Sequence, residues 1–172
     1  NPSSLHAAGQ AASGVLVRAR ETMARLLGCA PHELVFTSGG SESDNQALLS
    51  AAALGAAQGC RHIVSTAFEH HAVLHTLNRL RARGFDVTLL PVHEDGVVTA
   101  ADIAAALRPD TCLVSVMYAN NEIGTIQPAD EIGALCRARG VLLHTDAVQA
   151  AGHLPIALAA PPIDLMSISA HK

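Results

Sequence analysis

The sequence contains few aromatic residues and carries little excess charge. Its 172 residues include three Phe, one Tyr and no Trp, and the formal net charge is −4. Proteins that bind nucleic acid usually present clustered Lys and Arg side chains, and single-strand binders add aromatic side chains on which bases stack. Because the sequence has neither feature, we expect no nucleic-acid partner.

A membrane-spanning pattern and a secretory signal are also missing. A spanning helix needs about 20 consecutive apolar residues, whereas the Ala-rich run at 47–57 is interrupted by Ser50 and Gly55. The opening residues 1–4, Asn-Pro-Ser-Ser, lack the charged and apolar regions of a signal peptide. We therefore expect no membrane partner and a cytoplasmic location. Since the first residue is not Met, we also expect the chain to be a piece of a longer gene product.

Metal-binding patterns are equally scarce. The four cysteines, at positions 29, 60, 112 and 136, form no CxxC pair and have no histidine at zinc-ligand spacing. Without a secretory signal they are interpreted as reduced thiols packed as small core residues. His71 and His75 are one helical turn apart, but two ligands without a third are better interpreted as a solvated helix face. No metal site is predicted.

Lysine is the rarest of the charged residues. The chain has ten arginines and a single lysine, Lys172. An arginine cannot lose its proton in a protein, whereas a lysine can be tuned to attack a carbonyl group and form a Schiff base. A chain that uses Arg wherever a surface cation is needed has kept Lys at one position, so Lys172 is a candidate for this chemistry.

Apolar runs alternate between helical and strand-like patterns along the chain. The strands are continuous apolar runs, which is typical of a sheet covered by helices on both faces. The sequence thus predicts one α/β domain over 1–172, with a mostly parallel sheet between two helical layers and ligands at the carboxyl ends of the strands. The predicted helices cover 15–27, 41–58, 70–83, 100–107 and 128–140, and the predicted strands 34–37, 63–65, 87–90, 112–117, 141–144 and 163–168.

A glycine-rich turn follows the first predicted strand. Gly39 and Gly40 allow a tight turn, and Ser41 can cap the next helix with Asp44 three residues on. Free N–H groups and a serine hydroxyl at a helix start also make a phosphate cup. A plain helix cap is the alternative interpretation of this segment. The pattern matches neither the dinucleotide fingerprint nor the P-loop.

Other strands are followed by groups that could contact a flat heterocycle. His70 could stack on a ring and move protons. Asp146 could hold a proton on a ring nitrogen, with Gln149 reaching a ring oxygen, or it could simply cap a helix. The amides Asn120 and Asn121 could likewise be turn formers rather than ligands.

The last predicted strand is followed by Ser169, His171 and Lys172. Together, the strand ends offer a phosphate cup, a ring-stacking imidazole, an acid for a ring nitrogen and an amine for an aldehyde. Pyridoxal 5'-phosphate (PLP) needs all four groups, because PLP sites pair a Schiff-base lysine with an acidic partner for the pyridine nitrogen. The sequence therefore predicts a PLP site.

Five segments, in order along the chain, resemble the signature blocks of the NifS/IscS-like cysteine desulfurases. These enzymes belong to the class V aminotransferase group of fold-type I PLP enzymes, so the resemblance implies the three-layer large domain of a PLP-dependent transferase. The opening residues 1–6 are also similar to an early segment of the family. The five segments are 37–45 (TSGGSESDN), 69–70 (EH), 120–124 (NNEIG), 144–149 (HTDAVQ) and 169–172 (SAHK).

The resemblance implies a role for each matched residue. Lys172 would hold PLP and move protons, and His70 would stack on the ring and assist proton transfer. Asp146 would pair with the pyridine nitrogen, Gln149 with the ring hydroxyl oxygen, and Asn121 would lie near the substrate carboxylate. The phosphate would be bound by Gly40, Ser41, Ser169 and His171, where Ser41 replaces the threonine common in the family.

The resemblance also implies a reaction and partners. L-cysteine would become L-alanine, with sulfur passed through an enzyme persulfide to an acceptor or scaffold protein, and the enzyme would be a homodimer. Family members continue beyond the lysine with the persulfide cysteine and a smaller domain, so we expect none of the four cysteines here to be that thiol and the fragment alone to be inactive. A selenocysteine lyase or another class V enzyme is the alternative, and a non-catalytic nucleotide-binding module is a third.

Overall fold

The structure, a computed structural model, describes residues 1–156, 158 and 162–172. It divides the chain into two compact units, one of Asn1–Phe36 with Ile156–Ala160 and one of Thr37–Pro155 with Pro161–Lys172. The interpretation of 1–172 as one domain stays a prediction.

The first unit is built on the helix α1, Ala7–Leu27, and the short 3-10 helix η1, Pro31–Glu33. α1 begins eight residues before the predicted start, because the imidazole of His6 caps it by accepting a hydrogen bond from the Gly9 N–H at 3.1 Å. Gly28 ends it in the left-handed conformation at φ 72°. No helix among the described residues is both long and apolar enough to cross a membrane.

The predicted strand at 34–37 is wrong. These residues are extended, but no strand of the described chain pairs with them. Val35 and Phe36 are 63% and 50% exposed. An apolar run forms a strand only where a neighbouring strand accepts and donates its backbone hydrogen bonds, and local sequence does not contain that information.

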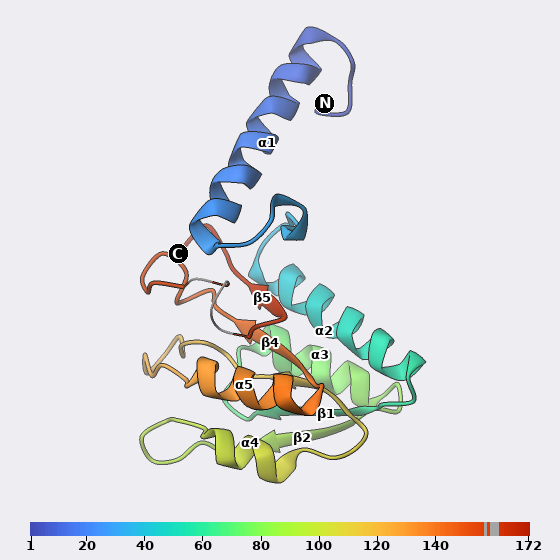
Figure 1. Ribbon diagram of the computed structural model, residues 1–172, viewed down its shortest axis with the longest axis vertical. Helices are drawn as coiled ribbons and strands as arrows, with labels where there is room; N and C mark the ends of the chain where they lie inside the picture. Colours follow the sequence, from blue (N-terminus) through green and yellow to red (C-terminus); the bar gives the residue numbers. More distant parts are fainter. Residues whose placement is uncertain (157, 159–161) are drawn as a thin grey trace. The chain divides into compact units, whose positions relative to one another are not determined.

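The second unit contains a five-stranded sheet in the order β2-β1-β3-β4-β5 (Figure 1). All four pairings are parallel, as predicted. The order changes direction between β2-β1 and β3-β4-β5, which places a topological switch point between β1 and β3. The strands are β1 His62–Thr66, β2 Asp86–Leu90, β3 Thr111–Ser115, β4 Leu142–Asp146 and β5 Leu165–Ser167.

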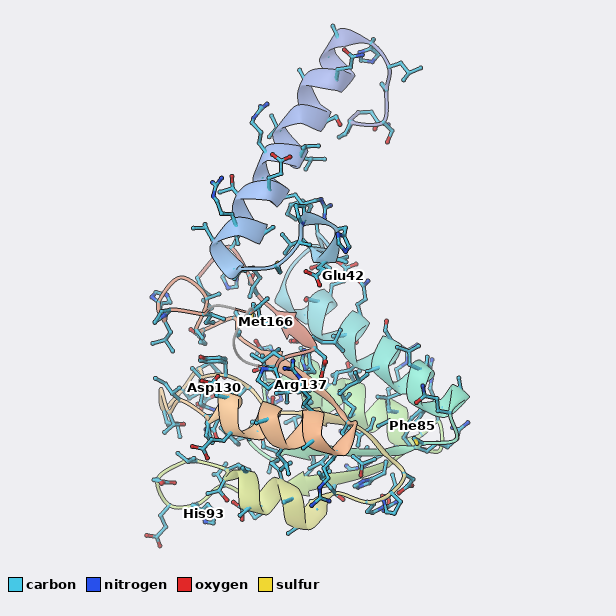
Figure 2. All side chains as sticks on the ribbon, viewed as in Figure 1. Glu42, Phe85, His93, Asp130, Arg137 and Met166 are labelled. Atoms are coloured by element: carbon cyan, nitrogen blue, oxygen red, sulfur yellow. The ribbon has the colours of Figure 1, made fainter. Side chains whose placement is uncertain are left out.

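Four helices alternate with these strands, each close to its predicted range: α2 Gly40–Ala57, α3 His71–Arg81, α4 Ala100–Ala106 and α5 Ala129–Arg139. α4 has a reciprocal capping box between Thr99 and Asp102. α5 carries Asp130 in its first turn and Arg137 in its last turn (Figure 2). Each charge is opposite in sign to the partial charge of the helix dipole at that end, so both interactions are favourable.

Two hydrophobic cores lie on opposite faces of the sheet. Adjacent strand residues point to opposite faces, so Ile63 joins the core beneath α2 and α3 while Val64 joins the core beneath α4 and α5. Leu113 and Val114 divide in the same way. The predicted three-layer α/β arrangement is confirmed (Figure 1).

Candidate active site

The carboxyl ends of the parallel strands bring the predicted site segments to one edge of the sheet. Residues 67–70 follow β1, 116–121 follow β3, 147–150 follow β4 and 168–172 follow β5. A cavity of about 580 Å³ opens near the starts of β3 and β4 and is lined by none of the predicted site residues. The edge formed by the strand ends is therefore the candidate site.

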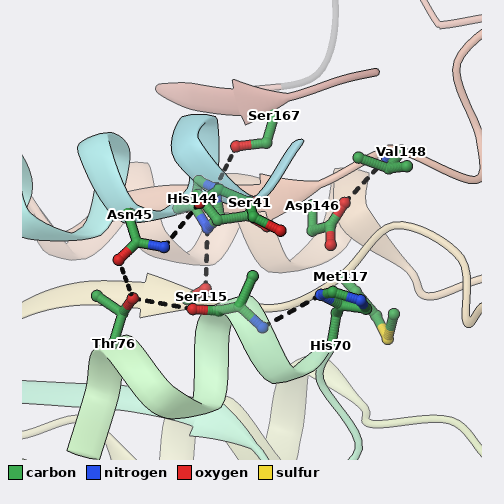
Figure 3. Close-up of polar contacts among 12 residues, drawn as sticks. Ser41, Asn45, His70, Thr76, Ser115, Met117, His144, Asp146, Val148 and Ser167 are labelled. Carbon is green, nitrogen blue, oxygen red and sulfur yellow. Dashed lines mark hydrogen bonds and ion pairs between the residues drawn. The ribbon is translucent and has the colours of Figure 1, made fainter. Parts of the chain in front are cut away.

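The start of α2 lies against this edge. A Cβ atom on Gly40 would be 2.8 Å from Cγ2 of Val148 and 3.7 Å from Cβ of Ser169, so the turns after β4 and β5 require glycine here. Ser41, exposed in the first turn, shares a groove of about 380 Å³ with His70 (Figure 3 shows both). Gly40, Ser41 and Ser169 are three of the four residues predicted to bind phosphate. These contacts bring them together with His70, the predicted ring-stacking residue.

The expected Ser41–Asp44 cap is wrong. α2 begins at Gly40, one residue earlier than predicted, and the carboxylate of Glu42 accepts a hydrogen bond from the Ser38 N–H at 2.6 Å. Hydrogen bonding by the Ser38 side chain, and then by this N–H group, lowers the pKa of Glu42. Asp44 points inward instead and is 1% exposed. The side chain that sequence reasoning assigned to a helix end is thus a buried part of the site.

Asp146, at the end of β4, is buried and lies close to His70. One carboxylate oxygen of Asp146, one of Asp44 and one ring nitrogen of His70 all lie within 4.8 Å of one another. Burial raises the pKa of Asp146, while the Val148 N–H, which donates to it at 2.9 Å, and the nearby His70 oppose this shift (Figure 3). The Val148 contact stabilises the turn after β4, and the pairing of Asp146 with a ring nitrogen stays a prediction.

The same three groups are the one set in the described part of the chain that could together hold a metal ion. Two carboxylates and an imidazole are suitable ligands for a divalent cation. His71 and His75, with ring centroids 5.6 Å apart, are exposed and have no third ligand among the described residues.

His70 occupies the N-cap of α3. Its Nδ1 accepts a hydrogen bond from the Ala72 N–H at 3.1 Å, which leaves the proton of the neutral ring on Nε2. The helix therefore begins at His71, one residue later than predicted, and its cap fixes the imidazole at the strand edge.

The remaining candidates lie in the segments expected. Oγ of Ser169 and Nδ1 of His171 are hydrogen-bonded at 2.7 Å in the turn after β5. Lys172 is exposed in that segment, and Gln149 is half-buried in the turn after β4. Asn121 is exposed after β3, where its neighbour Asn120 organises the loop by accepting from the N–H groups of Glu122 and Ile123. The roles of these residues stay predictions.

Sequence reasoning missed Glu69, which is fully buried beside His70. Its Oε1 accepts hydrogen bonds from the Thr66 hydroxyl at 2.5 Å and from the Met117 N–H at 2.9 Å, which joins the ends of β1 and β3. Its Oε2 has no hydrogen-bond partner among the described residues, and burial raises the pKa of Glu69 to about 8. The sequence signal that could have identified Glu69 is its place in a Glu-His pair shortly after the apolar strand β1.

Comparison with known proteins identifies the family of this chain. The family model for aminotransferase class V matches residues 1–172, which is the whole chain. The chain belongs to the aminotransferase class-V family. This family uses PLP.

Curated class-V relatives include the putative cysteine desulfurase IscS 1 of Bacillus subtilis, 49% identical over 172 residues. The cysteine desulfurase IscS of Stutzerimonas stutzeri is 50% identical over 173 residues. Both alignments include all of this chain but only 45% and 43% of the relative. The chain thus spans less than half the length of these curated relatives.

Solved structures of similar proteins have the same fold. A NifS-like protein superposes with a TM-score of 0.94 at 40% identity, covering 99% of this chain and 47% of that protein. A structure described as SspA in complex with cysteine gives a TM-score of 0.94 at 37% identity and covers 99% and 49%. These likenesses support the fold predicted from the strand and helix pattern.

Proposed function

We propose that this chain forms the cofactor-binding part of a PLP-dependent cysteine desulfurase. The observation that carries the proposal is the pairing of buried Asp146 with His70 at the edge where Lys172, the single lysine, follows β5. The similarity to curated cysteine desulfurases and to a structure titled as a cysteine complex supports this choice of substrate.

The residues present fit PLP in charge. Asp44, Glu69 and Asp146 are all buried, and each has a raised pKa. His70 lies close to both Asp146 and Asp44, and Nε2 of His144 lies 3.6 Å from Oδ1 of Asp44. A buried carboxylate is stabilised by a neighbouring cation, and a protonated pyridine nitrogen next to Asp146 would supply one.

Each of the chain's own groups would have a defined task. PLP, when bound, supplies an electron sink for bonds broken at the substrate α- and β-carbons. Asp146 would keep the ring nitrogen protonated, and His70, fixed by its cap on α3, would cover the ring. The Lys172 amine would attach the cofactor and afterwards accept and return the substrate protons. Gln149 would donate to the ring oxygen.

The turn at Gly40 would bind the phosphate. Gly40 lies close to Ser169, and Ser169 is hydrogen-bonded to His171. The N–H groups at the start of α2, the hydroxyls of Ser41 and Ser169, and the imidazole of His171 would together contact the phosphate. A helix N-terminus with adjacent hydroxyl groups is a favourable site for a phosphate dianion. Asn121 would bind the substrate carboxylate.

The overall reaction would move sulfur from L-cysteine to a thiol of the enzyme. The cysteine C–S bond breaks, the sulfur forms an S–S bond with the acceptor thiol to give a persulfide, and the β-carbon gains the proton that completes L-alanine. Cys112 and Cys136 are buried with raised pKa values, which suits neither for attack as a thiolate. The acceptor thiol is proposed to lie outside this chain, with delivery to a protein that assembles iron-sulfur clusters or other sulfur cofactors.

The proposal is tested in the full-length protein through Lys172. Borohydride reduction of the PLP-loaded protein should fix the label on Lys172, and Lys172→Arg should abolish both labelling and the formation of alanine and sulfide. Arg83→Lys, an exposed change in the turn after α3, should leave both unchanged. Labelling at another position, or normal turnover by Lys172→Arg, would refute the assignment.

A selenocysteine lyase is the alternative from the same family, since both activities would use the same cofactor residues. Comparing kcat/KM for L-cysteine and L-selenocysteine distinguishes them. A desulfurase turns over both substrates and forms a persulfide on the enzyme, whereas a lyase strongly prefers selenocysteine. Light scattering of the loaded protein tests the proposed homodimer.

A further inference from the structure

The strands β1 and β3 separate at the edge that forms the candidate site. They are paired as far as Ser65 and Ser115. Beyond that pair the Ala67 N–H donates to β2 at 2.9 Å, whereas the Tyr118 N–H donates to β4 at 2.8 Å. The chain leads to α3 after β1 and to α5 after β3, and these helices cover opposite faces of the sheet. Among the described residues no backbone hydrogen bond joins 67–70 to 116–121.

A buried carboxyl group bridges this gap. Oε1 of Glu69 accepts hydrogen bonds from the Thr66 hydroxyl at 2.5 Å and from the Met117 N–H at 2.9 Å. Glu69 is 5% exposed and Met117 is 2% exposed. Without this acceptor the Met117 N–H would be a buried donor that has lost its partner, which is costly. One side chain thus joins the end of β1 to the backbone of the segment after β3.

A second, weaker contact joins the same two segments. Nδ2 of Asn120 donates to the backbone oxygen of Phe68 at 3.3 Å. Both contacts come from the two residues that precede His70, and they bind these residues to the segment after β3. The segment that carries His70 is therefore fixed from the side of β3 as well as by its own cap on α3.

We propose that Glu69 is a positioning residue that acts through His70. Ligands of open α/β sheets bind at the topological switch point, where neighbouring segments leave in opposite directions. By bridging β1 and β3 at that point, Glu69 holds the His70 imidazole where it would cover the cofactor ring. The function of Glu69 is to accept two hydrogen bonds, so glutamine can replace it and leucine cannot. This inference rests on the proposed function, because it takes from there the task of His70.

The first measurement needs no cofactor. The full-length, cofactor-free protein is labelled with 13C at its histidine rings and studied by NMR at one fixed pH with a chelator present. The ring signals of His70 are assigned with His70→Ala. Glu69→Leu should shift these signals, whereas Glu69→Gln, which keeps the Oε1 acceptor, should leave them close to those of the parent. A loss of stability alone would lower the folded fraction without moving the signals of the native state.

The second measurement is a double-mutant cycle on the PLP-loaded protein. Turnover of L-cysteine is expressed per folded, PLP-loaded molecule. Because a displacement of about 1 Å can cost about 10²-fold in rate, Glu69→Leu should lower kcat by about that factor. In a His70→Ala background the same change should cost less than about twofold, since a residue that acts only through His70 has nothing left to position.

Glu131→Leu, an exposed change on α5, is the matched control and should alter neither the His70 signals nor kcat. If Glu69→Leu does not fold, Thr66→Val replaces it, because it removes one of the two donors to Oε1. It should shift the His70 signals by a smaller amount. Unchanged His70 signals, or a loss of kcat in the His70→Ala background as large as in the parent, would overturn the inference.

Lys172 separates this inference from the proposed function. If Lys172→Arg turns over L-cysteine as the parent does, the proposed function fails and the inference fails with it. If Lys172→Arg is inactive while Glu69→Leu keeps the kcat and the His70 signals of the parent, only the inference about Glu69 fails.

Discussion

Replacing Glu69 by Gln should change how the stability of the cofactor-free protein depends on pH. In the fold the pKa of Glu69 is raised from 4.5 to about 8, chiefly by burial. A carboxyl group with a raised pKa contributes stability in its protonated form, and that stability is lost as the pH rises from the unfolded value through the folded one. Glutamine cannot ionise, so the variant lacks this loss.

The magnitude follows from the size of the shift. Each unit corresponds to about 1.4 kcal/mol, so between about pH 5.5 and 7.5 the parent should lose about 3 kcal/mol relative to Glu69→Gln. At low pH the variant should be less stable by about 1–3 kcal/mol, because its amide N–H groups replace the unpartnered Oε2 and find no acceptor. The two stability curves should therefore cross as the pH rises.

Urea unfolding monitored by circular dichroism at a series of pH values measures this difference directly. Glu94→Gln, an exposed change in the loop after β2, should follow the parent at every pH. A difference between the parent and Glu69→Gln that does not vary with pH would mean that Glu69 is already ionised in the fold.

Three further predictions concern packing and burial in the second unit. Gly55→Ala would place a methyl group 2.6 Å from Sγ of Cys112. We expect this overpacking to lower the free energy of unfolding, measured in urea, by about 1–3 kcal/mol. The higher helix propensity of Ala should offset up to about 1 kcal/mol of that loss. Thr111→Val removes the hydroxyl that contacts Nδ1 of buried His62 at 2.7 Å, which should cost about 1–3 kcal/mol of unfolding free energy and change the ring's tautomer signals in 15N NMR. Cys136 is 0% exposed and burial raises its pKa to about 12, so iodoacetamide at pH 8 should modify it in the native protein only as fast as global unfolding allows.

Much of the fold was predictable because its signals are local. The five strands of the sheet are apolar runs, and each helix between them has a glycine, proline or capping side chain near its ends. Residues that follow parallel strands meet at one edge of the sheet, so the sequence was enough to predict that His70 and Asp146 lie near each other.

The rest depends on contacts between distant segments. Residues 34–37 have a strand-like composition, yet no neighbouring strand pairs with them in the described structure. Asp44 matches a capping pattern, but burial against β4 and β5 gives it another environment. Likewise, no local pattern shows that Glu69 contacts the Met117 N–H, 48 residues later in the chain.

The short strand β5 has a consequence for the order in which the site can open. β4 is bonded to strands on both sides, whereas β5 has three residues and pairs with β4 alone among the described strands. Amide hydrogens near Asp146 should therefore exchange with solvent slowly, and those of the segment that ends at Lys172 much faster. In the cofactor-free protein Asp146 would therefore be held in a fixed position by β4. Lys172 would lie on a segment that opens and closes independently of β4.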